Sequence, residues 1–328
     1  MQLPEVQIPL MASNHKARIL TIMRDVELLL ALPIEPTRGF DRTTTSDFTN
    51  CSLPLVSHIL AQKTVSAFAE GLTRPMLMRA IPSDGVFFGQ LNQASPHVQM
   101  LQEWQRAALV ITGNYDNWLE NNFDQKRRKE FKRQRKRLSE QGILALETLN
   151  QSSDFKQFVD DYLELEAKGW KGKRGTALNT SGQQSSTFHK ICAELHGTGR
   201  LRFWILRLNG KAIAALFGVV SGAQAQIIKI TYDEAFAKFS PGVQIVLDAT
   251  AAFFAEPGLK IVDSCAIPNH PMINRIWRER LSMADVLIAP PDYAAWKFQN
   301  VLIGLKIHAA LRALAKVIFL TLTRRKKS

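Results

Sequence analysis

The sequence predicts a mixed α/β fold of the α+β kind, in which a mostly antiparallel sheet is flanked by helices. Three observations lead to this prediction. The pair Asn209-Gly210 joins two alternating apolar runs, which is a strong signal for a β-hairpin. A third apolar run, AQIIKIT, follows Ser221-Gly222 and extends the hairpin to an antiparallel meander. Segments in which apolar residues recur at helical spacing lie before and after these strands.

The first half of the chain is also predicted to be α/β. The runs ARILTIM and VELLLAL fit either a strand or a helix. Apolar residues at helical spacing predict a helix over 57–70, which Gly71 ends. A strand at 76–81, a helix that begins near Ser83 and a strand at 106–112 follow.

The second half gives a clearer order of elements. A very basic helix over 124–141 ends at Gly142, and a strand follows at 143–149. A helix capped by Ser152 or Ser153 and a second helix over 183–195 come next, before the meander. The remaining elements are a helix over 242–255, a strand at 261–266, a helix over 270–281 and a strand at 285–289. The order β-αα-βββ-α-β-α-β is that of the GNAT acyltransferase fold, which by itself does not define a function.

The length of 328 residues predicts two domains. We expect an N-terminal α/β half at 1–120, a basic linker helix at 121–142, the acyltransferase domain at 143–296 and a basic amphipathic helix and tail at 297–328.

The net charge of +13 is concentrated in two places. The segment 126–137 holds nine basic residues and one acid, and the C-terminal RRKK adds four cations. Local charge of this kind predicts a local anionic partner: a phosphate-rich ligand, an anionic membrane surface or, as the third choice, a nucleic acid.

The cysteines and histidines argue against metal or disulfide chemistry. Three scattered cysteines favour a reducing, cytoplasmic compartment, and the absence of Cys-x-x-Cys or His-Glu-x-x-His spacing predicts no metal site. Cys265 is interpreted as a small packing residue, because direct attack by an amine needs no cysteine nucleophile.

Several segments in unbroken order resemble a known family. They are KRRKEFKRQRKRLSEQG, LEAKGWKGKRGTAL, NGKAIAALF, KITYDEAFAKFSPGVQI and DSCAIPNHPMINRIWRER, and they cover roughly 120–290. The chain resembles the GNAT-like acetyltransferases of the CelD/BcsL type from bacterial cellulose and polysaccharide biosynthesis, which are related to the FemAB aminoacyl transferases. The resemblance implies an acyl-coenzyme A-dependent N-acyltransferase, with acetyl-coenzyme A as co-substrate, and a degenerate GNAT-like first half.

The resemblance also implies a donor site where the fourth strand of the domain splays from the fifth. The pyrophosphate of the donor would lie at the start of the next helix, where free N–H groups and the helix dipole favour an anion. Here that helix start is Ser240-Pro241-Gly242-Val243. Ser240 is a residue type that caps helices, Pro241 fits the first helical position, and Gly242 lets a phosphate approach the backbone. Lys229 is a further candidate for phosphate binding. The alternative is an ordinary capped helix.

Candidate acid–base residues follow the splayed strand. Asp233 is the first candidate base, Tyr232 the candidate acid and Asp263 the second candidate base. Alternatively, Asp233 pairs with Lys229 or Lys238 and only fixes the loop.

On the acceptor side, an indole beside cations suits a sugar or a phosphate. The candidate acceptor residues are Trp170, Lys171, Lys173, Arg174 and His270.

Two further interpretations stay open. A FemAB-like transferase would use aminoacyl-tRNA, and a degenerate domain would serve as a non-catalytic component of a polysaccharide assembly. The C-terminal helix either packs on the protein core or lies on an anionic membrane as a peripheral element.

Overall fold

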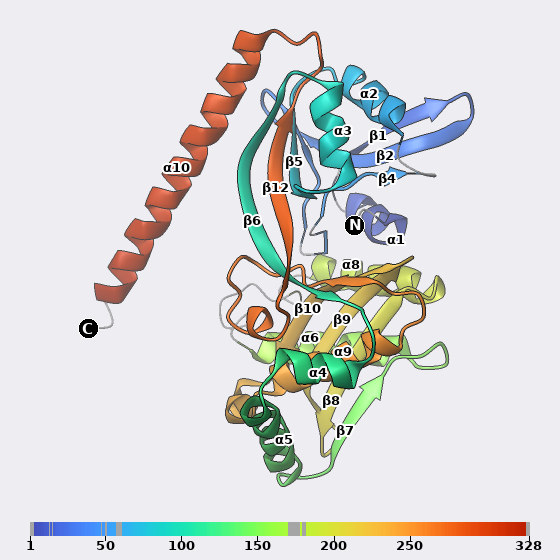
Figure 1. The fold of residues 1–328 in the computed structure, drawn as a ribbon, viewed down its shortest axis with the longest axis vertical. Helices are drawn as coiled ribbons and strands as arrows, with labels where there is room; N and C mark the ends of the chain where they lie inside the picture. The colour runs from blue at the N-terminus through green and yellow to red at the C-terminus, as the bar shows by residue number, and fades with distance from the viewer. Residues whose placement is uncertain are drawn as a thin grey trace. The chain divides into compact units, whose positions relative to one another are not determined.

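The computed structural model describes residues 3–12, 14, 16–46, 48–49, 51–56, 61–169, 178 and 182–325, with side chains up to residue 315. The chain divides into two compact units (Figure 1). The first contains residues 1–2, 16–104 and 282–328, and the second contains residues 3–15 and 105–281. Both units combine helices with mostly antiparallel strand pairs, which confirms the predicted fold class. The predicted borders at 120, 142 and 296 stay predictions.

In the first unit the strands follow the order β1-β2-β3-β5-β12-β6, and β4 pairs with β2. The pairing of β3 with β5 is parallel, whereas β1–β2, β2–β3, β2–β4 and β5–β12 are antiparallel. The strand bounds are Arg18–Arg24 (β1), Glu27–Pro36 (β2), Asp41–Thr43 (β3), Leu55–Val56 (β4), Met76–Pro82 (β5), Val98–Val110 (β6) and Glu279–Ile288 (β12). The helices are α2 (Gln62–Glu70), α3 (Val86–Ala94) and α10 (Ala295–Arg325).

The two runs that fit either strand or helix in the sequence are both strands. They form the antiparallel pair β1–β2, in which Leu30 and Leu32 of β2 are fully buried. Helix α2 packs against this core through Val65 and Phe68, which lie one turn apart on one face. The predicted strand at 76–81 and the helix that follows it are confirmed as β5 and α3.

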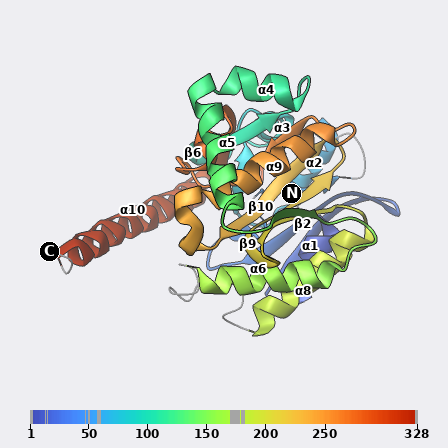
Figure 2. The same cartoon turned by 90° about the horizontal axis from the view of Figure 1, so that it is seen from below.

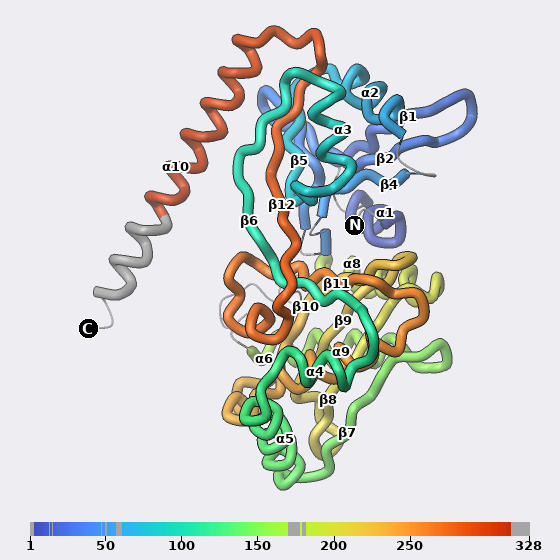
Figure 3. Tube along the Cα trace, viewed as in Figure 1, coloured from blue at the N-terminus to red at the C-terminus, as the bar shows by residue number. Residues whose placement is uncertain are grey.

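In the second unit the strands follow the order β6-β11-β10-β9-β8-β7. The strand bounds are Leu144–Thr148 (β7), Leu201–Leu208 (β8), Lys211–Ser221 (β9), Gln224–Tyr232 (β10) and Ile261–Asp263 (β11). The α-helices are α1 (Pro4–Ala12), α4 (Tyr115–Asn122), α5 (Gln125–Ser139), α6 (Phe155–Lys168), α8 (Gly182–Gly197) and α9 (Pro241–Ala255). Two short 3-10 helices are η2 (Glu234–Phe239) and η3 (Ile273–Arg275). The chain path is drawn in Figure 3.

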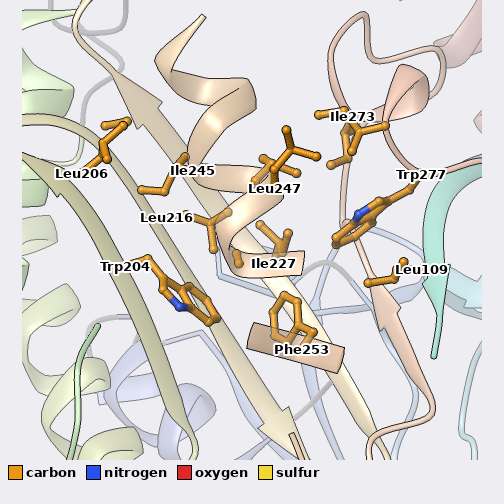
Figure 4. Close-up of a cluster of buried hydrophobic side chains, with 14 of the residues drawn as sticks. Leu109, Trp204, Leu206, Leu216, Ile227, Ile245, Leu247, Phe253, Ile273 and Trp277 are labelled. Atoms are coloured by element: carbon orange, nitrogen blue, oxygen red, sulfur yellow. The ribbon is translucent and has the colours of Figure 1, made fainter. Parts of the chain in front are cut away.

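Helices cover both faces of this sheet, with α9 on one side and α6 and α8 on the other (Figure 2). Successive residues of a strand point to opposite faces. Accordingly, Trp204 of β8 packs against Phe253 of α9, while its neighbour Phe203 packs against Phe158 of α6. Figure 4 shows the apolar core between the sheet and α9, in which Trp277 is also fully buried.

The predicted meander is confirmed. Asn209 and Gly210 have φ values of 49° and 78°, the left-handed pair that a tight two-residue hairpin turn requires. The Asn209 side chain also accepts the N–H of Ile143 at 2.8 Å and so ties the turn to the start of β7. The turn residues therefore fix both the β8–β9 register and the neighbouring loop.

The basic helix is confirmed as α5, with Asp124 as its N-cap. The Asp124 carboxylate accepts the N–H of Arg127 at 2.7 Å. Phe131 and Leu138 are its buried apolar side chains, as the sequence predicted. Gln244 of α9 donates to the Phe131 carbonyl at 3.2 Å, so α5 packs along α9. Seven cations of α5 are exposed: Lys126, Arg127, Lys129, Lys132, Arg133, Lys136 and Arg137.

The predicted helix over 270–281 is wrong. Only Ile273–Arg275 forms a 3-10 turn, and residues from Glu279 onward belong to β12. Asn269 has a left-handed φ of 57°, and Pro271 follows, so the chain turns here instead of entering a helix. Trp277 then fills the core and donates its indole N–H to Thr250 at 3.1 Å.

The predicted cap of α6 by Ser152 or Ser153 is also wrong, because Asp154 is the N-cap. Its carboxylate accepts the N–H of Lys156 at 3.0 Å. Ser153 instead stabilises the preceding turn, where its hydroxyl oxygen accepts the N–H of Asn150 at 3.1 Å. Aspartate and serine are similar N-cap residues, so the sequence pattern did not separate them.

Among its residues with described side chains, up to 315, helix α10 packs only its first turns on the rest of the first unit. Phe298 and Leu302 are buried against Leu77 and Leu287, whereas side chains on the other face are exposed. Within the described residues, none of the helices has the length and apolar character needed to cross a bilayer.

Candidate functional site

The neighbouring strands β10 and β11 are parallel and separate after a short stretch of pairing. Residues 224–226 of β10 pair with residues 261–263 of β11. β10 then continues to Tyr232, whereas β11 ends at Asp263. The edge of β10 from residue 227 to residue 232 therefore has no strand partner on this side within the described chain. This is the divergence expected for a splayed fourth strand.

A β-bulge lies where this pairing stops. Opposite β9, Ile227 pairs with Gly218 and Lys229 with Phe217, so Ile228 is the extra residue. A bulge bends a strand and increases its twist. Gly218 makes the close approach possible, because a Cβ at this position would lie 2.6 Å from the Gln226 carbonyl oxygen. This role of Gly218 was not predicted from the sequence.

The start of α9 presents one unpaired backbone donor. Pro241 occupies the first helical position, as predicted, and has no N–H. The N–H groups of Val243 and Gln244 donate to the Ser240 carbonyl at 2.9 and 3.1 Å. The Gly242 N–H has no partner in the described part of the chain and points from a helix N-terminus, which favours an anion.

The predicted cap by the Ser240 side chain is wrong. Ser240 is left-handed, with φ 53° and ψ 52°, and its side chain makes no capping hydrogen bond. It follows η2 directly, so its backbone must reverse between two helical segments. The residue acts through its carbonyl oxygen instead.

Gly242 is also required for packing. A Cβ at this position would lie 3.0 Å from Tyr232 Cδ1 and 3.3 Å from Met272 Sδ. The end of β10, the start of α9 and the loop after β11 therefore meet at Gly242. This brings Tyr232 next to the candidate phosphate-binding residues, while about a third of its surface stays exposed.

Asp233 has a structural role in this arrangement. It is the N-cap of η2, and its carboxylate accepts the N–H of Ala235 at 2.9 Å. Its own N–H donates to the Ile213 carbonyl at 2.8 Å. Lys229 is a partly buried residue of β10 beyond the bulge. A role of Asp233 in proton transfer stays a prediction, and so does phosphate binding by Lys229.

Asp263 forms a buried ion pair with Arg106 of β6. The residues are 8% and 3% exposed, and the Arg106 guanidinium contacts Asp263 Oδ2. The other carboxylate oxygen accepts the N–H of Cys265 at 2.8 Å. Both oxygens are thus engaged, which makes Asp263 a weaker candidate base than the sequence indicated. Arg106 was not identified from the sequence, because it lies 157 positions away from Asp263.

Asp263→Asn is expected to lower the free energy of unfolding by about 3 to 5 kcal/mol, because it removes the carboxylate from a buried guanidinium. Glu120→Gln is the matched control: Glu120 pairs with Arg128 at 2.5 Å, but its side chain is 63% exposed. An exposed pair contributes about 1 kcal/mol or less. Urea unfolding measures both, and an equal loss in the two variants would contradict the structural role of the buried pair.

His270 is held in its neutral form. Its Nδ1 accepts the N–H groups of Met272 and Ile273 at 3.3 and 3.4 Å, so the proton of the neutral ring lies on Nε2. Burial lowers the pKa of His270 below its ordinary value near 6.5. The imidazole shapes the loop that carries Met272, and a role in acceptor binding stays a prediction.

This burial predicts a pH dependence of stability. Because the folded-state pKa of His270 is depressed, protonation favours the unfolded chain. The stabilisation is present above the unfolded-state value near 6.5 and is lost as the pH falls from there through the lower folded-state pKa. His270→Gln should flatten this part of the curve of unfolding free energy against pH. Parallel curves for the parent and the variant would show that His270 does not cause the dependence.

An open cavity of about 300 Å³ lies between α6 and the start of β9. Its lining includes Asp161, Glu164, Lys168 and Lys211. Asp161 pairs with Arg207 at 2.6 Å, and Glu164 pairs with Lys168. The cavity is at the same end of the sheet as Tyr232, because Tyr232 pairs with Ala214 of β9.

The remaining sequence candidates are four acceptor-side residues and Cys265. Trp170, Lys171, Lys173 and Arg174 lie outside the described residues. Cys265 is partly buried and left-handed, with φ 50°. The described residues contain no group of three histidine, cysteine or acidic side chains that could hold a metal ion.

Comparison with known proteins identifies the domain. Residues 125–270 match the family model of the acetyltransferase (GNAT) domain. This segment contains β10, α9 and β11 and ends at His270, so it includes the whole divergence of the two strands. Among curated proteins, no sequence matches this chain.

Solved structures share the fold over most of the chain. One is the C-terminal domain of a protein assigned as a lysylphosphatidylglycerol synthetase from Agrobacterium fabrum, with 11% identity, a TM-score of 0.57 and 88% of each chain covered. Another is FemX, with 10% identity, a TM-score of 0.57 and coverage of 87% of this chain and 90% of FemX. At such identities the likeness concerns the fold alone. Residues 125–270 are therefore similar to GNAT acetyltransferase domains by the family match, and the chain shares its fold with these solved structures.

Proposed function

We propose that the protein is an acyl-coenzyme A-dependent N-acyltransferase with acetyl-coenzyme A as donor. The observation that supports this most is the divergence of β10 from β11 beside a helix start whose Gly242 N–H is unpaired. A pantetheine chain has amide groups that can pair with the open edge of β10, and the pyrophosphate suits the N-terminus of α9. Lys229, Ser240, Pro241, Gly242 and Val243 are the proposed donor-binding residues.

In the proposed reaction the acceptor amine attacks the thioester carbonyl carbon. The C–N bond forms, the C–S bond breaks, and the amine loses a proton to a base. Tyr232 is the proposed acid that protonates the leaving thiolate, because it lies against Gly242 at the donor-binding helix start. Asp233 is the first candidate base, and Asp263 ranks below it because of its ion pair with Arg106.

The proposed acceptor is an amine on a saccharide or a lipid-linked intermediate of cell-envelope or polysaccharide synthesis, including cellulose synthesis. The support is the resemblance of the segments between 120 and 290 to the CelD/BcsL type. The cavity between α6 and β9 is the proposed acceptor entrance, since it lies at the same end of the sheet as Tyr232. His270 and the segment with Trp170, Lys171, Lys173 and Arg174 are proposed to contribute.

A second candidate function uses aminoacyl-tRNA as donor. The observation that favours it is the row of exposed cations on α5, which packs along α9 through Arg135–Asp248 and Gln244. A phosphodiester backbone would suit such a row. The helix offers no exposed aromatic residue for base stacking, so we rank this donor below acetyl-coenzyme A. A non-catalytic component of a polysaccharide assembly is the third candidate.

We place the proposed enzyme in the cytoplasm, with reversible attachment to an anionic membrane. The support is the concentration of positive charge in α5 and in the C-terminal tail.

Calorimetry with three ligands tests this proposal. Acetyl-coenzyme A and coenzyme A should both bind, because they share the pyrophosphate and pantetheine. Uncharged tRNA should bind weakly and lose its affinity steeply with salt. Tight tRNA binding without coenzyme A binding would favour the second candidate, and binding of none of them would favour the third.

A further inference from the structure

Helix α10 carries a row of exposed apolar side chains. Trp296, Ile303, Ile307, Leu311 and Leu314 are each more than half exposed. At about 100° per residue, these positions fall within about 80° of the helix circumference. They therefore form one apolar stripe between positions 296 and 314, here called the α10 stripe, in which Asn300 is a polar position.

The α10 stripe lies on the face opposite to the one that packs on the first unit. Phe298 and Leu302 are buried, and Val301 and Leu305 are partly buried against the same cluster. At helical spacing these four positions lie on the side of the helix opposite to the stripe. The core contacts thus hold the helix start and leave the stripe without an intramolecular partner among the described residues.

The charge around the stripe has a single sign. Residues 293–328 contain eight lysines and arginines and no aspartate or glutamate. Lys297 and Lys306 fall about a quarter turn to either side of the stripe, and the Lys297 ammonium lies 5.5 Å from the centre of the Trp296 ring. Long lysine side chains on either side let the stripe enter the acyl region of a bilayer while their ammonium groups stay at the headgroups.

The apolar stripe and the cations beside it together fit one of three kinds of partner. An RNA partner would use the cations but would leave the isoleucines and leucines in water. A second copy of the helix would cover the stripe but would bring cations of the same sign together. An anionic bilayer satisfies both features, and a tryptophan at the first turn suits the interfacial region.

We propose that the α10 stripe is a docking surface for an anionic lipid bilayer, with the helix lying in the plane of the interface. The inference rests on the proposed function only in placing the transferase beside a lipid-linked acceptor. It does not require donor binding, because α10 belongs to the first unit and the donor site to the second.

Vesicle co-sedimentation of the full chain tests the proposal. The stripe variant is Ile303→Ser, Ile307→Ser and Leu311→Ser combined. The matched control is Ala309→Ser, Ala313→Ser and Ala315→Ser, which changes exposed residues of the same helix off the stripe. Helix content of both variants is compared by circular dichroism. A third variant, Lys297→Gln with Lys306→Gln and Arg312→Gln, tests the charge.

The parent should bind vesicles of phosphatidylglycerol and phosphatidylcholine at low salt but not pure phosphatidylcholine. The stripe and charge variants should lose about tenfold or more in vesicle affinity, since each removes several membrane contacts. The alanine control should bind as the parent does. The proposal would be overturned if the stripe variant bound vesicles as the parent does, or if the parent bound neutral vesicles equally well or bound none. It would also be overturned if the parent were a dimer in the absence of vesicles and the stripe variant were not. Calorimetry with acetyl-coenzyme A reports separately on the proposed function.

Discussion

Gly242→Asp is expected to reduce acetyl-coenzyme A affinity by roughly a hundredfold or more, because a carboxylate beside a bound pyrophosphate costs several kcal/mol. The new charge would lie at the helix start whose Gly242 N–H is proposed to bind the phosphate. Acids in the first turn of a helix are favourable in the absence of an anion. The loss should therefore appear in binding and not in helix formation.

Gly242→Ala is the matched control for size. A Cβ would lie 3.0 Å from Tyr232 Cδ1 and 3.3 Å from Met272 Sδ, so both side chains must move by a few tenths of an ångström. We expect a smaller loss of affinity than for aspartate, and Tyr232→Leu in the Gly242→Ala background should relieve part of it. Calorimetry measures the affinities and thermal unfolding reports on the fold. If folded Gly242→Asp binds the donor as the parent does, the donor site lies elsewhere.

Tyr232→Phe is expected to lower kcat by roughly a hundredfold to ten-thousandfold, which is the usual contribution of a positioned acid or base. Phenylalanine keeps the ring that packs on Gly242 and removes only the hydroxyl. Donor affinity should therefore stay close to that of the parent. Steady-state transfer to an amine acceptor, combined with calorimetry, separates these two effects.

Asp233→Asn is the companion variant, and its rate loss is compared with that of Tyr232→Phe. Asparagine caps a helix about as well as aspartate, so the hydrogen bond to Ala235 is retained while the basic group is lost. A rate loss comparable to that of Tyr232→Phe would support Asp233 as the base. Full turnover in both variants would show that neither residue takes part in proton transfer and that Asp233 and Tyr232 have structural roles alone.

The sequence predicted the second unit well where local rules decide the structure. Asn209-Gly210 requires left-handed backbone and defines the β8–β9 hairpin. The helix α5 has a capping aspartate and only two large apolar residues, Phe131 and Leu138, both of which are buried. In such segments propensity, turn chemistry and tertiary packing agree.

Prediction was wrong where long-range contacts override local spacing. The apolar residues between 270 and 281 fit a helix, but Trp277 is drawn into the core and bonds Thr250 of α9. Ser240 has the residue type of a helix cap, yet the junction with η2 forces it into the left-handed region. The contact of Trp277 with α9 is not visible within a short window of sequence, and the residue-type rule for Ser240 does not show that η2 ends directly before α9.

The candidate site was predicted in part. The loop from Lys229 to Gly242 was identified as one region, and the structure brings Tyr232 and Gly242 into contact. Arg106, Gly218 and Met272 were missed, because their roles depend on distant strands and on a loop of irregular backbone. The sequence signal that could have indicated the ion pair is Arg106, a cation directly before the apolar run at 107–111.

A crystal structure with bound coenzyme A tests the central claim most directly. We predict the pyrophosphate within hydrogen-bonding distance of the Gly242 N–H and the pantetheine along residues 227–232 of β10, where the pairing with β11 has ended. Coenzyme A bound elsewhere, with the start of α9 free of phosphate, would contradict the account.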